Sequence, residues 1–222
     1  PLTMIKAYAS MVKEISGDDP QKRNRHLQVI IDESDRLTGL VNDILNASKV
    51  SAGLSELNKK VFNLTDFVYG IMNKFDYLQE TSGYKFYVDI DPNMYTFADE
   101  EKIYQVIYNL VSNAVAHLES GGQITVRLTD KKESVRAEVI DNGSGIDEKE
   151  LPFIFDRYYR SRSDAGKRGS GLGLSIVKAI LVAHNAPFGV QSVVGQGSDF
   201  WFELPPAPPA ETQKNGKPSN KT

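Results

Sequence analysis

Three glycines at alternate positions, Gly169, Gly171 and Gly173, stand before an apolar stretch that reads as a helix, in the segment RGSGLGLS at 168–175. Glycine loses more backbone entropy on folding than any other residue, so three glycines this close together need a purpose. A glycine-rich loop at the start of a helix offers backbone N–H groups and the positive end of the helix dipole to an anion such as a phosphate. Taken alone, the segment favours a phosphate loop and a plain flexible turn about equally.

Neither of the two common phosphate loops matches this segment. A dinucleotide-binding loop needs GxGxxG directly after a buried strand, but Leu174 occupies the place of the third spaced glycine, and the preceding RSRSDAGKR is too polar for such a strand. A GxxxxGK[ST] loop would have a lysine where Leu172 stands. The phosphate hypothesis therefore depends on the neighbouring motifs.

Polar residues elsewhere in the chain are suitable partners for a phosphate and a divalent ion. Asn109 and Asn113, in NLVSNA, are four residues apart, which places them on one face of a predicted helix. A buried amide without a partner costs about 1 to 3 kcal/mol, and Mg²⁺ with phosphates would supply partners. Asp141, in DNGSGI, stands at the end of a predicted strand and is followed by Gly143 and Gly145.

The N-terminal part of the chain predicts a helical hairpin. Apolar residues recur every three or four positions from Pro1 to about Ser16, and GDDP at 17–20 separates this helix from the next, with Asp19 as N-cap and Pro20 at the first helical position. Residues 21–50 carry two interleaved heptads, namely Ile30, Leu37 and Ile44 on one line and Ser34, Val41 and Ser48 on the other. Two helices cannot enclose this stripe, so we expect a second copy to complete a four-helix bundle. Packing of the stripe on the rest of the same chain is the alternative.

After Gly53 the pattern changes to mixed strands and helices. The predicted elements are a short strand and a helix over 61–75, a strand over 84–90, a helix over 98–118, strands over 123–129 and 134–141, a helix over 171–184, and a closing hairpin around GQG at 195–197. This order indicates an α+β sandwich with helices on one face of a mixed sheet. The proline-rich, polar residues after Pro205 predict a disordered tail.

Composition argues against several other functions. The 222 residues have a formal net charge of −3 with scattered cationic residues, so no electrostatic footprint for nucleic acid stands out. The chain contains no cysteine, which rules out disulfides and thiolate metal sites. No apolar run is long enough to span a bilayer. We expect this segment to be a cytoplasmic fragment, and any membrane anchor to belong to an upstream part of its parent.

Five motifs follow one another in the order NLVSNA, DNGSGI, FDRYYR, GSGLGLSIVKAI and SVVGQGSDFWFELP. They resemble the N, G1, F, G2 and G3 boxes of the sensor histidine kinases of two-component signalling. The hairpin, with RLTGLVNDILNASKVSAG, is similar to the dimerisation and phosphotransfer bundle of that family. The resemblance implies an ATP-binding domain of the histidine kinase/Hsp90-like ATPase type at 58–207, after a hairpin domain at 1–57 and before a tail at 208–222.

The resemblance also implies roles around the adenine base. Asp141 would accept a hydrogen bond from the adenine amino group, while Gly143, Gly145 and Ile146 would let the backbone approach the base. His117 could stack on the ring, although a helix histidine without a ligand is nearly as compatible with the pattern. A turn-forming role is the alternative for Asp141.

The implied cofactors are ATP and Mg²⁺. Asn113 would ligate the ion through its amide oxygen, and Asn109 would support the same ion, with a structural hydrogen bond as its alternative role. Arg160 would reach the γ-phosphate, unless it is simply a solvated surface residue. The residues that would wrap the phosphates, within a lid at about 156–173, are Gly169, Gly171, Leu172 and Gly173. Phe155 is expected to anchor the lid by packing on the bundle or the core.

Two departures from the family pattern stand out. Ala116 occupies a place where a phosphate-contacting lysine is common, and the usual HGG reads His184, Asn185, Ala186. Alanine adopts the left-handed backbone region reluctantly, so we expect a distorted turn there. Together the changes predict weaker nucleotide affinity.

The family's phosphoacceptor histidine lies upstream of the proline that Pro1 matches, and neither His26, His117 nor His184 fits that role. We therefore expect the fragment to bind ATP without phosphorylating itself, whereas its parent would phosphorylate the histidine and then an aspartate on a response regulator receiver domain. The expected partners are this receiver domain and a second copy of the chain, bound through helices 1–50. A catalytically inactive ATP-binding and dimerisation scaffold is the main alternative. A chaperone-type or topoisomerase-type ATPase would need a glutamate where Asn109 stands.

Overall fold

The computed structural model describes residues 2–51, 56–161 and 171–208. The chain separates into two compact units, Pro1–Lys49 and Val50–Thr222. The domain limits predicted from the sequence, 1–57 and 58–207, remain a prediction, and the proposed tail lies almost wholly outside the described residues. Within the described part of the chain, no helix is long and apolar enough to cross a membrane.

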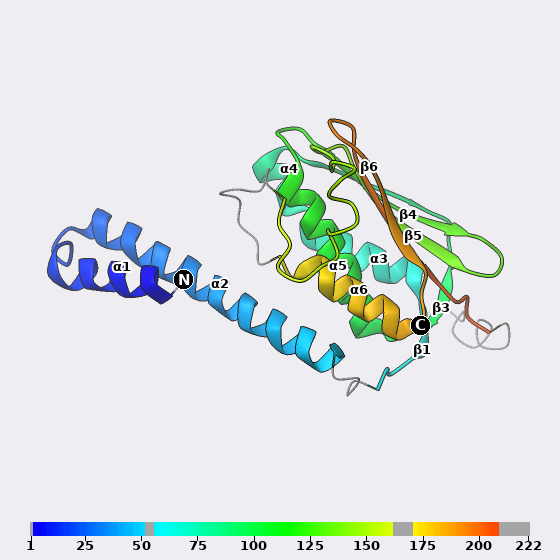
Figure 1. The fold of residues 1–222 in the computed structure, drawn as a ribbon. Helices are drawn as coiled ribbons and strands as arrows, with labels where there is room; N and C mark the ends of the chain where they lie inside the picture. Colours follow the sequence, from blue (N-terminus) through cyan, green and yellow to red (C-terminus); the bar gives the residue numbers. More distant parts are fainter. Residues whose placement is uncertain (1, 52–55, 162–170, 209–222) are drawn as a thin grey trace, which may run out of the picture. The chain divides into compact units, whose positions relative to one another are not determined.

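The first unit is a helical hairpin of α1 (Leu2–Glu14) and α2 (Pro20–Ser51). The carboxylate of Asp19 accepts the N–H groups of Gln21 and Lys22, each at 3.1 Å, which confirms the predicted N-cap before Pro20. Across the hairpin, the ring of His26 meets the ring of Tyr8 edge-on at 5.3 Å. The two helices therefore run antiparallel, as the sequence predicted (Figure 1).

This hairpin covers its apolar stripe, which Ile31 widens, only in part: Ile30 and Leu37 are half-buried. No residue of α1 is buried. Ile15 is 77% exposed, and Ile31 on α2 is 52% exposed. The predicted heptad positions Val41, Ile44 and Ser48 lie beyond the side chains that the structure describes. These exposed apolar residues fit a surface that another chain covers.

The second unit is built on a mixed sheet. Five of its described strands, β2 (Lys85–Ile90), β4 (Gln123–Asp130), β5 (Val135–Asp141), β6 (Phe188–Val193) and β7 (Gly197–Leu204), lie in the order β2-β4-β5-β7-β6. Only β2 and β4 pair in parallel; the other neighbours are antiparallel. The strands β1 (Lys60–Asn63) and β3 (Tyr95–Ala98) form a separate antiparallel pair. The sequence did not predict β3.

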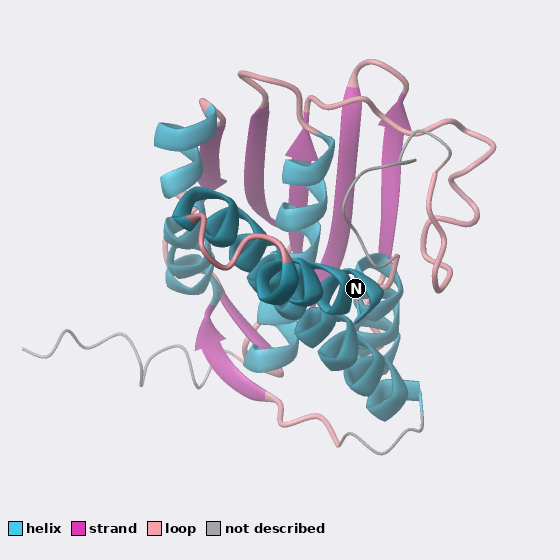
Figure 2. Ribbon diagram, turned by 90° about the vertical axis from the view of Figure 1, so that its left-hand side faces the viewer, coloured by secondary structure: helices cyan, strands magenta, loops and turns pink. Residues whose placement is uncertain are grey.

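Helices cover one face of this sheet (Figures 1 and 2). They are α3 (Leu64–Met72), the 3-10 turn η1 (Asn73–Phe75), α4 (Tyr77–Ser82), α5 (Glu100–His117) and α6 (Gly173–His184). The predicted inner face of α5 is confirmed, since its buried residues are Ile103, Val106, Ile107, Leu110, Val111 and Ala114. The core lies between this helical layer and the inward side chains of the strands, so the predicted α+β class is correct.

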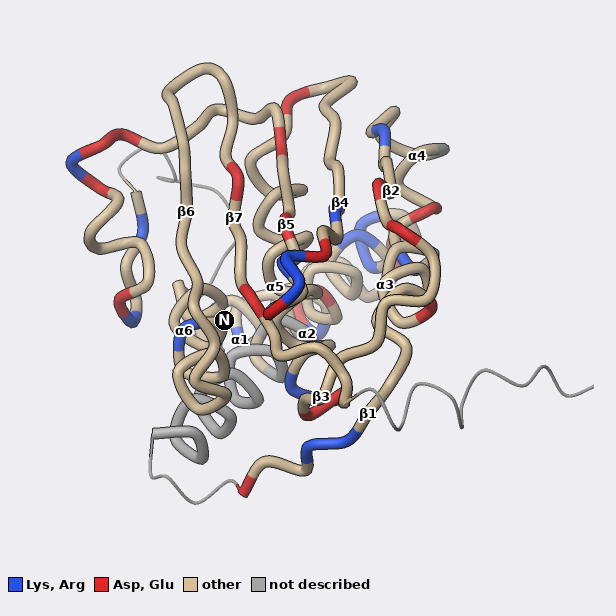
Figure 3. Tube along the Cα trace, turned by 90° about the vertical axis from the view of Figure 1, so that its right-hand side faces the viewer, with Lys and Arg blue, Asp and Glu red and all other residues tan. Residues whose placement is uncertain are grey.

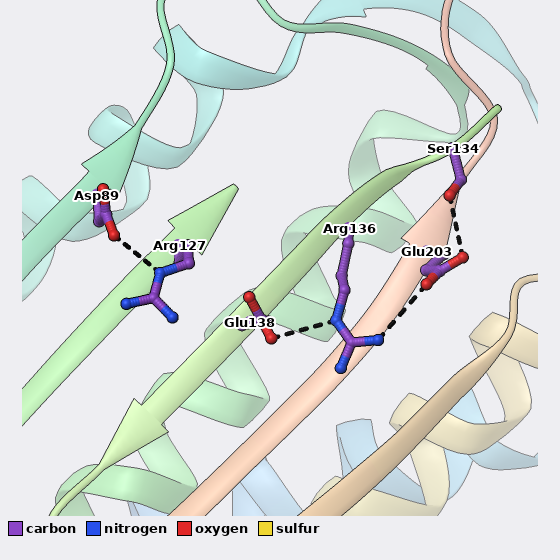
Figure 4. Close-up of polar contacts among 6 residues, drawn as sticks. All are labelled: Asp89, Arg127, Ser134, Arg136, Glu138 and Glu203. Atoms are coloured by element: carbon purple, nitrogen blue, oxygen red, sulfur yellow. Dashed lines mark hydrogen bonds and ion pairs between the residues drawn. The ribbon is translucent and has the colours of Figure 1, made fainter. Parts of the chain in front are cut away.

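The other face of the sheet carries charged residues, whose positions along the strands are coloured in Figure 3. Arg127 donates to Asp89 at 2.8 Å, and Arg136 pairs with Glu138 at 3.1 Å and with Glu203 at 3.5 Å (Figure 4). One apolar and one polar face explain why the strands alternate in sequence.

The turn after α6 is regular, so the predicted distortion at 184–186 is wrong. Asn185 alone takes the left-handed conformation, with φ 55° and ψ 34°. The N–H of Ala186 then donates to the carbonyl of Leu181 at 2.9 Å. This helix end needs only one residue at positive φ, and asparagine tolerates that region.

Candidate nucleotide site

Asp141 ends strand β5 and is nearly buried, with 6% of its surface exposed. One carboxylate oxygen accepts the N–H of Gly143 at 2.8 Å. Burial raises the pKa of this carboxyl, while N–H groups of Gly143 and Ser198 and the nearby His117 act in the opposite direction. The site thus holds a hydrogen-bond acceptor in a place from which water is largely excluded.

The loop after Asp141 is packed too closely for side chains at its two glycines. A Cβ on Gly143 would lie 2.6 Å from the carbonyl oxygen of His117. Gly145 has φ +67°, and a Cβ there would lie 2.1 Å from the carbonyl oxygen of Val193. The loop is therefore held against the end of α5 and against β6.

Ser192 on β6 joins the same loop to the β6–β7 turn, a role that no sequence pattern indicated. Its hydroxyl accepts the N–H of Ile146 at 2.8 Å and lies 2.8 Å from the carbonyl oxygen of Gly197. In addition, Gly195 donates its N–H to the carbonyl of Ser144 at 2.8 Å. The glycine pairs of the second and fifth motifs thus meet in space.

Helix α5 carries three of the predicted site residues at intervals of four: Asn109, Asn113 and His117. This spacing places them along one face of the helix. His117 lies close enough to Asp141 to act on the pKa of its carboxyl. The Nδ2 atom of Asn109 is buried, and no described group hydrogen-bonds to it. A buried amide in this state marks a place for a missing partner.

The glycine-rich start of α6 faces Asn109. A Cβ on Gly173 would lie 4.0 Å from the Cγ and Oδ1 atoms of the Asn109 amide. Leu172 beside it is buried, and the carbonyl of Gly171 accepts the N–H of Tyr158 at 2.9 Å. Residues of the G2, F and N motifs therefore lie next to one another. Beside them are the Nδ2–H of Asn109, which has no described partner, and the N-terminus of α6.

This arrangement fits a phosphate chain with a divalent ion. As placed, Asn109 presents a donor, which suits a phosphate oxygen; turning the amide by a half rotation would present its oxygen to a metal instead. Among the described residues, no three His, Asp or Glu side chains gather as a metal site. A hard cation here would depend on asparagine oxygens and on the phosphates themselves.

The structure describes fewer contacts for the remaining predicted site residues. Arg160 is exposed, two residues after Tyr158, and Gly169 lies outside the described residues. Phe155 packs edge-on against Phe188 at 5.2 Å and Phe200 at 6.3 Å, so it contacts the core, as expected for an anchor.

Known proteins are similar to this chain in sequence and architecture. The profile of the family described as "Histidine kinase-, DNA gyrase B-, and HSP90-like ATPase" matches residues 98–208, and that of the "His Kinase A (phospho-acceptor) domain" matches residues 1–53. Sensor histidine kinase WalK of Bacillus subtilis is 30% identical over 210 residues, which cover 92% of this chain and 34% of the relative. The chain thus spans about a third of the length of that relative.

Two solved structures share the fold. Histidine kinase ThkA in complex with response regulator protein TrrA has a TM-score of 0.75 and 27% identity, covering 95% of this chain and 59% of that one. Full-length ShkA in complex with AMPPNP has a TM-score of 0.74 and 25% identity, covering 92% and 43%. Matching profiles in both units, with this fold and the five motifs gathered on it, show that the chain belongs to the sensor histidine kinases of two-component systems.

Proposed function

We propose that the second unit binds ATP with Mg²⁺, and that the whole protein transfers the γ-phosphoryl group to a histidine and then to an aspartate of a response regulator. The observation that carries the proposal is the buried carboxylate of Asp141, 6% exposed at the end of a strand. Burying a carboxylate costs stability, and such a cost is typical of a functional site. The similarity to ShkA, solved with AMPPNP, supports an adenine nucleotide as the ligand.

Asp141 reads the base in this proposal. The exocyclic amino group of adenine is a donor, and the buried carboxylate accepts from it. Gly143 and Gly145 let the loop backbone lie close against α5 and β6 and approach the base, Ile146 borders the base, and the ring of His117 stacks on it. The position of His117 near Asp141, where it acts on the pKa of the carboxyl, supports this role.

The phosphates lie between α5 and the start of α6. Asn109 donates its open Nδ2–H to a phosphate oxygen, and Asn113 offers its amide oxygen to the ion. Gly169, Gly171, Leu172 and Gly173 supply backbone N–H groups, and Arg160 neutralises charge at the γ-phosphate. Bound Mg²⁺ would offset the charge on the phosphate oxygens during transfer.

The hairpin supplies dimerisation and the docking surface for the receiver domain. Its uncovered apolar residues support self-association, and the complex of the relative ThkA with TrrA supports a receiver partner. His26 lies on α2 with its Nδ1 2.9 Å from the hydroxyl of Ser16, and His184 is 5% exposed, which keeps its ring away from a nucleotide. We propose that the chain as given binds ATP without labelling itself.

Binding of a non-hydrolysable ATP analogue with Mg²⁺ tests the base-reading role. Asp141→Asn replaces an acceptor oxygen with a donor and is expected to weaken binding about 100-fold, as for a buried charged hydrogen bond. Asp130→Asn is the matched control, because Asp130 makes the same type of turn, accepting the N–H of Lys132, at the opposite end of the β4–β5 hairpin. Equal binding by both variants would refute the assignment.

The phosphotransfer step is tested separately. A longer chain that includes the residues upstream of Pro1 is incubated with γ-labelled ATP. Label that is lost in acid supports the histidine kinase, whereas a chain that binds ATP and never becomes labelled is the inactive scaffold.

Ala116→Lys should strengthen nucleotide binding if the missing lysine lowers the affinity.

A further inference from the structure

Helices α5 and α6 pack against each other in opposite directions. The start of α5, after Asp99, adjoins the end of α6 at His184, where the N–H of Asp99 donates to the imidazole Nε2 at 3.1 Å. At the other end of the pair, Asn109 of α5 faces Gly173 of α6. One contact thus fixes the helices at one end, and the proposed phosphate site lies at the other.

The imidazole of His184 is fully engaged in its neutral form. Its Nδ1 lies 2.9 Å from the carbonyl oxygen of Ile180 and donates to it, which leaves Nε2 as an acceptor for Asp99. The side chain is 5% exposed, and burial lowers its pKa. The charged groups around it are Lys59, Lys102 and Asp99; the lysines lower the pKa further, and Asp99 and the carbonyl of Ile180 raise it.

Asp99 holds three parts of the chain at this point. Its carboxylate accepts the N–H of Lys102 at 3.1 Å, capping α5, and the N–H of Asn58 at 2.9 Å, just before β1. Its own N–H goes to His184. A helix is stiff over this length, so a shift of α6 at His184 is carried along to Gly173.

We propose that His184 is a positioning residue for the triphosphate: through Asp99 it sets the register of α6 against α5, and so the gap between Gly173 and Asn109. This inference rests on the proposed ATP site. Sites of this kind lose affinity when groups move by as little as half an ångström. Adenosine, which would contact the Asp141 end only, should be insensitive to the same shift.

Two substitutions separate positioning from simple destabilisation. The amide of an asparagine can take the place of Nδ1 but offers no acceptor to the N–H of Asp99. The longer glutamine can place its amide oxygen, an acceptor, near the position of Nε2. His184→Asn should raise the Kd for the ATP analogue with Mg²⁺ about tenfold and leave the Kd for adenosine unchanged, while His184→Gln stays within about twofold for both ligands. Equal loss for both ligands, or no loss in His184→Asn, would overturn the inference.

The unmodified protein gives a second readout if the variants do not fold. Lowering the pH protonates Nε2, which then faces the N–H of Asp99, donor against donor. In an NMR titration without nucleotide, the amide signals of Asp99 and Gly173 should move with the His184 imidazole. Movement of Asp99 without Gly173 contradicts the coupling. If the unmodified protein binds neither ligand at millimolar concentration, the proposed function fails, whereas the NMR result stands by itself.

Discussion

Helices α1 and α5 are both amphipathic, yet only α5 buries its apolar face within the chain. The buried face of α5 packs into the core between the helical layer and the sheet, whereas no residue of α1 is buried. Helix α5 therefore contributes to a core within the second unit, whereas apolar residues of the hairpin stay exposed in this chain. One sequence pattern thus builds a core in the second unit, while in the hairpin it supports the proposed assembly.

The largest effect should come from opening the core of the second unit. Phe202 on β7 is fully buried, so Phe202→Ala removes its packing and leaves a cavity. Urea unfolding of the second unit should show a loss of about 3 to 5 kcal/mol. Ile15→Ala in the hairpin, at a side chain that is 77% exposed, should change the same transition by less than about 0.5 kcal/mol. Similar losses in both would break the contrast between the units.

The next effect concerns the loop after Asp141, beside the proposed base site. Gly145→Ala adds strain at positive φ and a clash with Val193, so we expect a loss of about 3 kcal/mol in thermal or urea unfolding. Gly121→Ala is the control, because Gly121 has φ +76° and open space around it, which leaves the backbone strain of about 1 kcal/mol alone. If the two variants are equally stable, the loop is looser than described.

A charge on the hairpin should weaken assembly and leave the second unit alone. Ile31→Asp places a carboxylate in the uncovered stripe and is expected to weaken self-association at least about tenfold in sedimentation analysis. Asn24→Asp adds the same charge at another exposed position of α2 and should have little effect. Unchanged self-association of Ile31→Asp would mean that this stripe is not the dimer surface.

The smallest effect is the pH dependence of stability that Asp141 contributes. Burial raises its folded-state pKa above the unfolded value, so its contribution is most favourable below the unfolded pKa and is lost as the pH rises through the folded pKa. Asp141→Asn removes this titration. The stability of the variant relative to the natural protein should therefore increase between acidic and neutral pH, measured by urea unfolding without nucleotide. A relative stability that falls over this range would contradict the assigned shift.

Features set by local pattern could be predicted from the sequence. The buried face of α5, the cap at Asp19 and the mixed sheet follow from periodicity and turn chemistry, and each is confirmed. The distortion predicted at 184–186 was wrong, because the capping residue Asn185 takes the strained conformation and spares Ala186.

Contacts between residues far apart in sequence could not be predicted in this way. Strand β3 has only four residues, and it is defined by its pairing with β1 more than thirty residues earlier. Ser192 and the contact of His184 with Asp99 leave no periodic signal, since each depends on how distant segments meet. The candidate site residues were proposed from chemical type, motif spacing and the family resemblance, and the structure adds the contacts that hold those it describes.

The most direct test compares adenine with guanine nucleotides by calorimetry on the unmodified chain with Mg²⁺. Adenine offers an amino donor to Asp141, whereas guanine presents a carbonyl acceptor at the same ring position. We predict heat that saturates at one nucleotide per chain for the ATP analogue and none for the GTP analogue at the same concentration. No heat with either nucleotide at millimolar concentration, or equal heats with both, would contradict the assignment of Asp141 as the residue that reads the base.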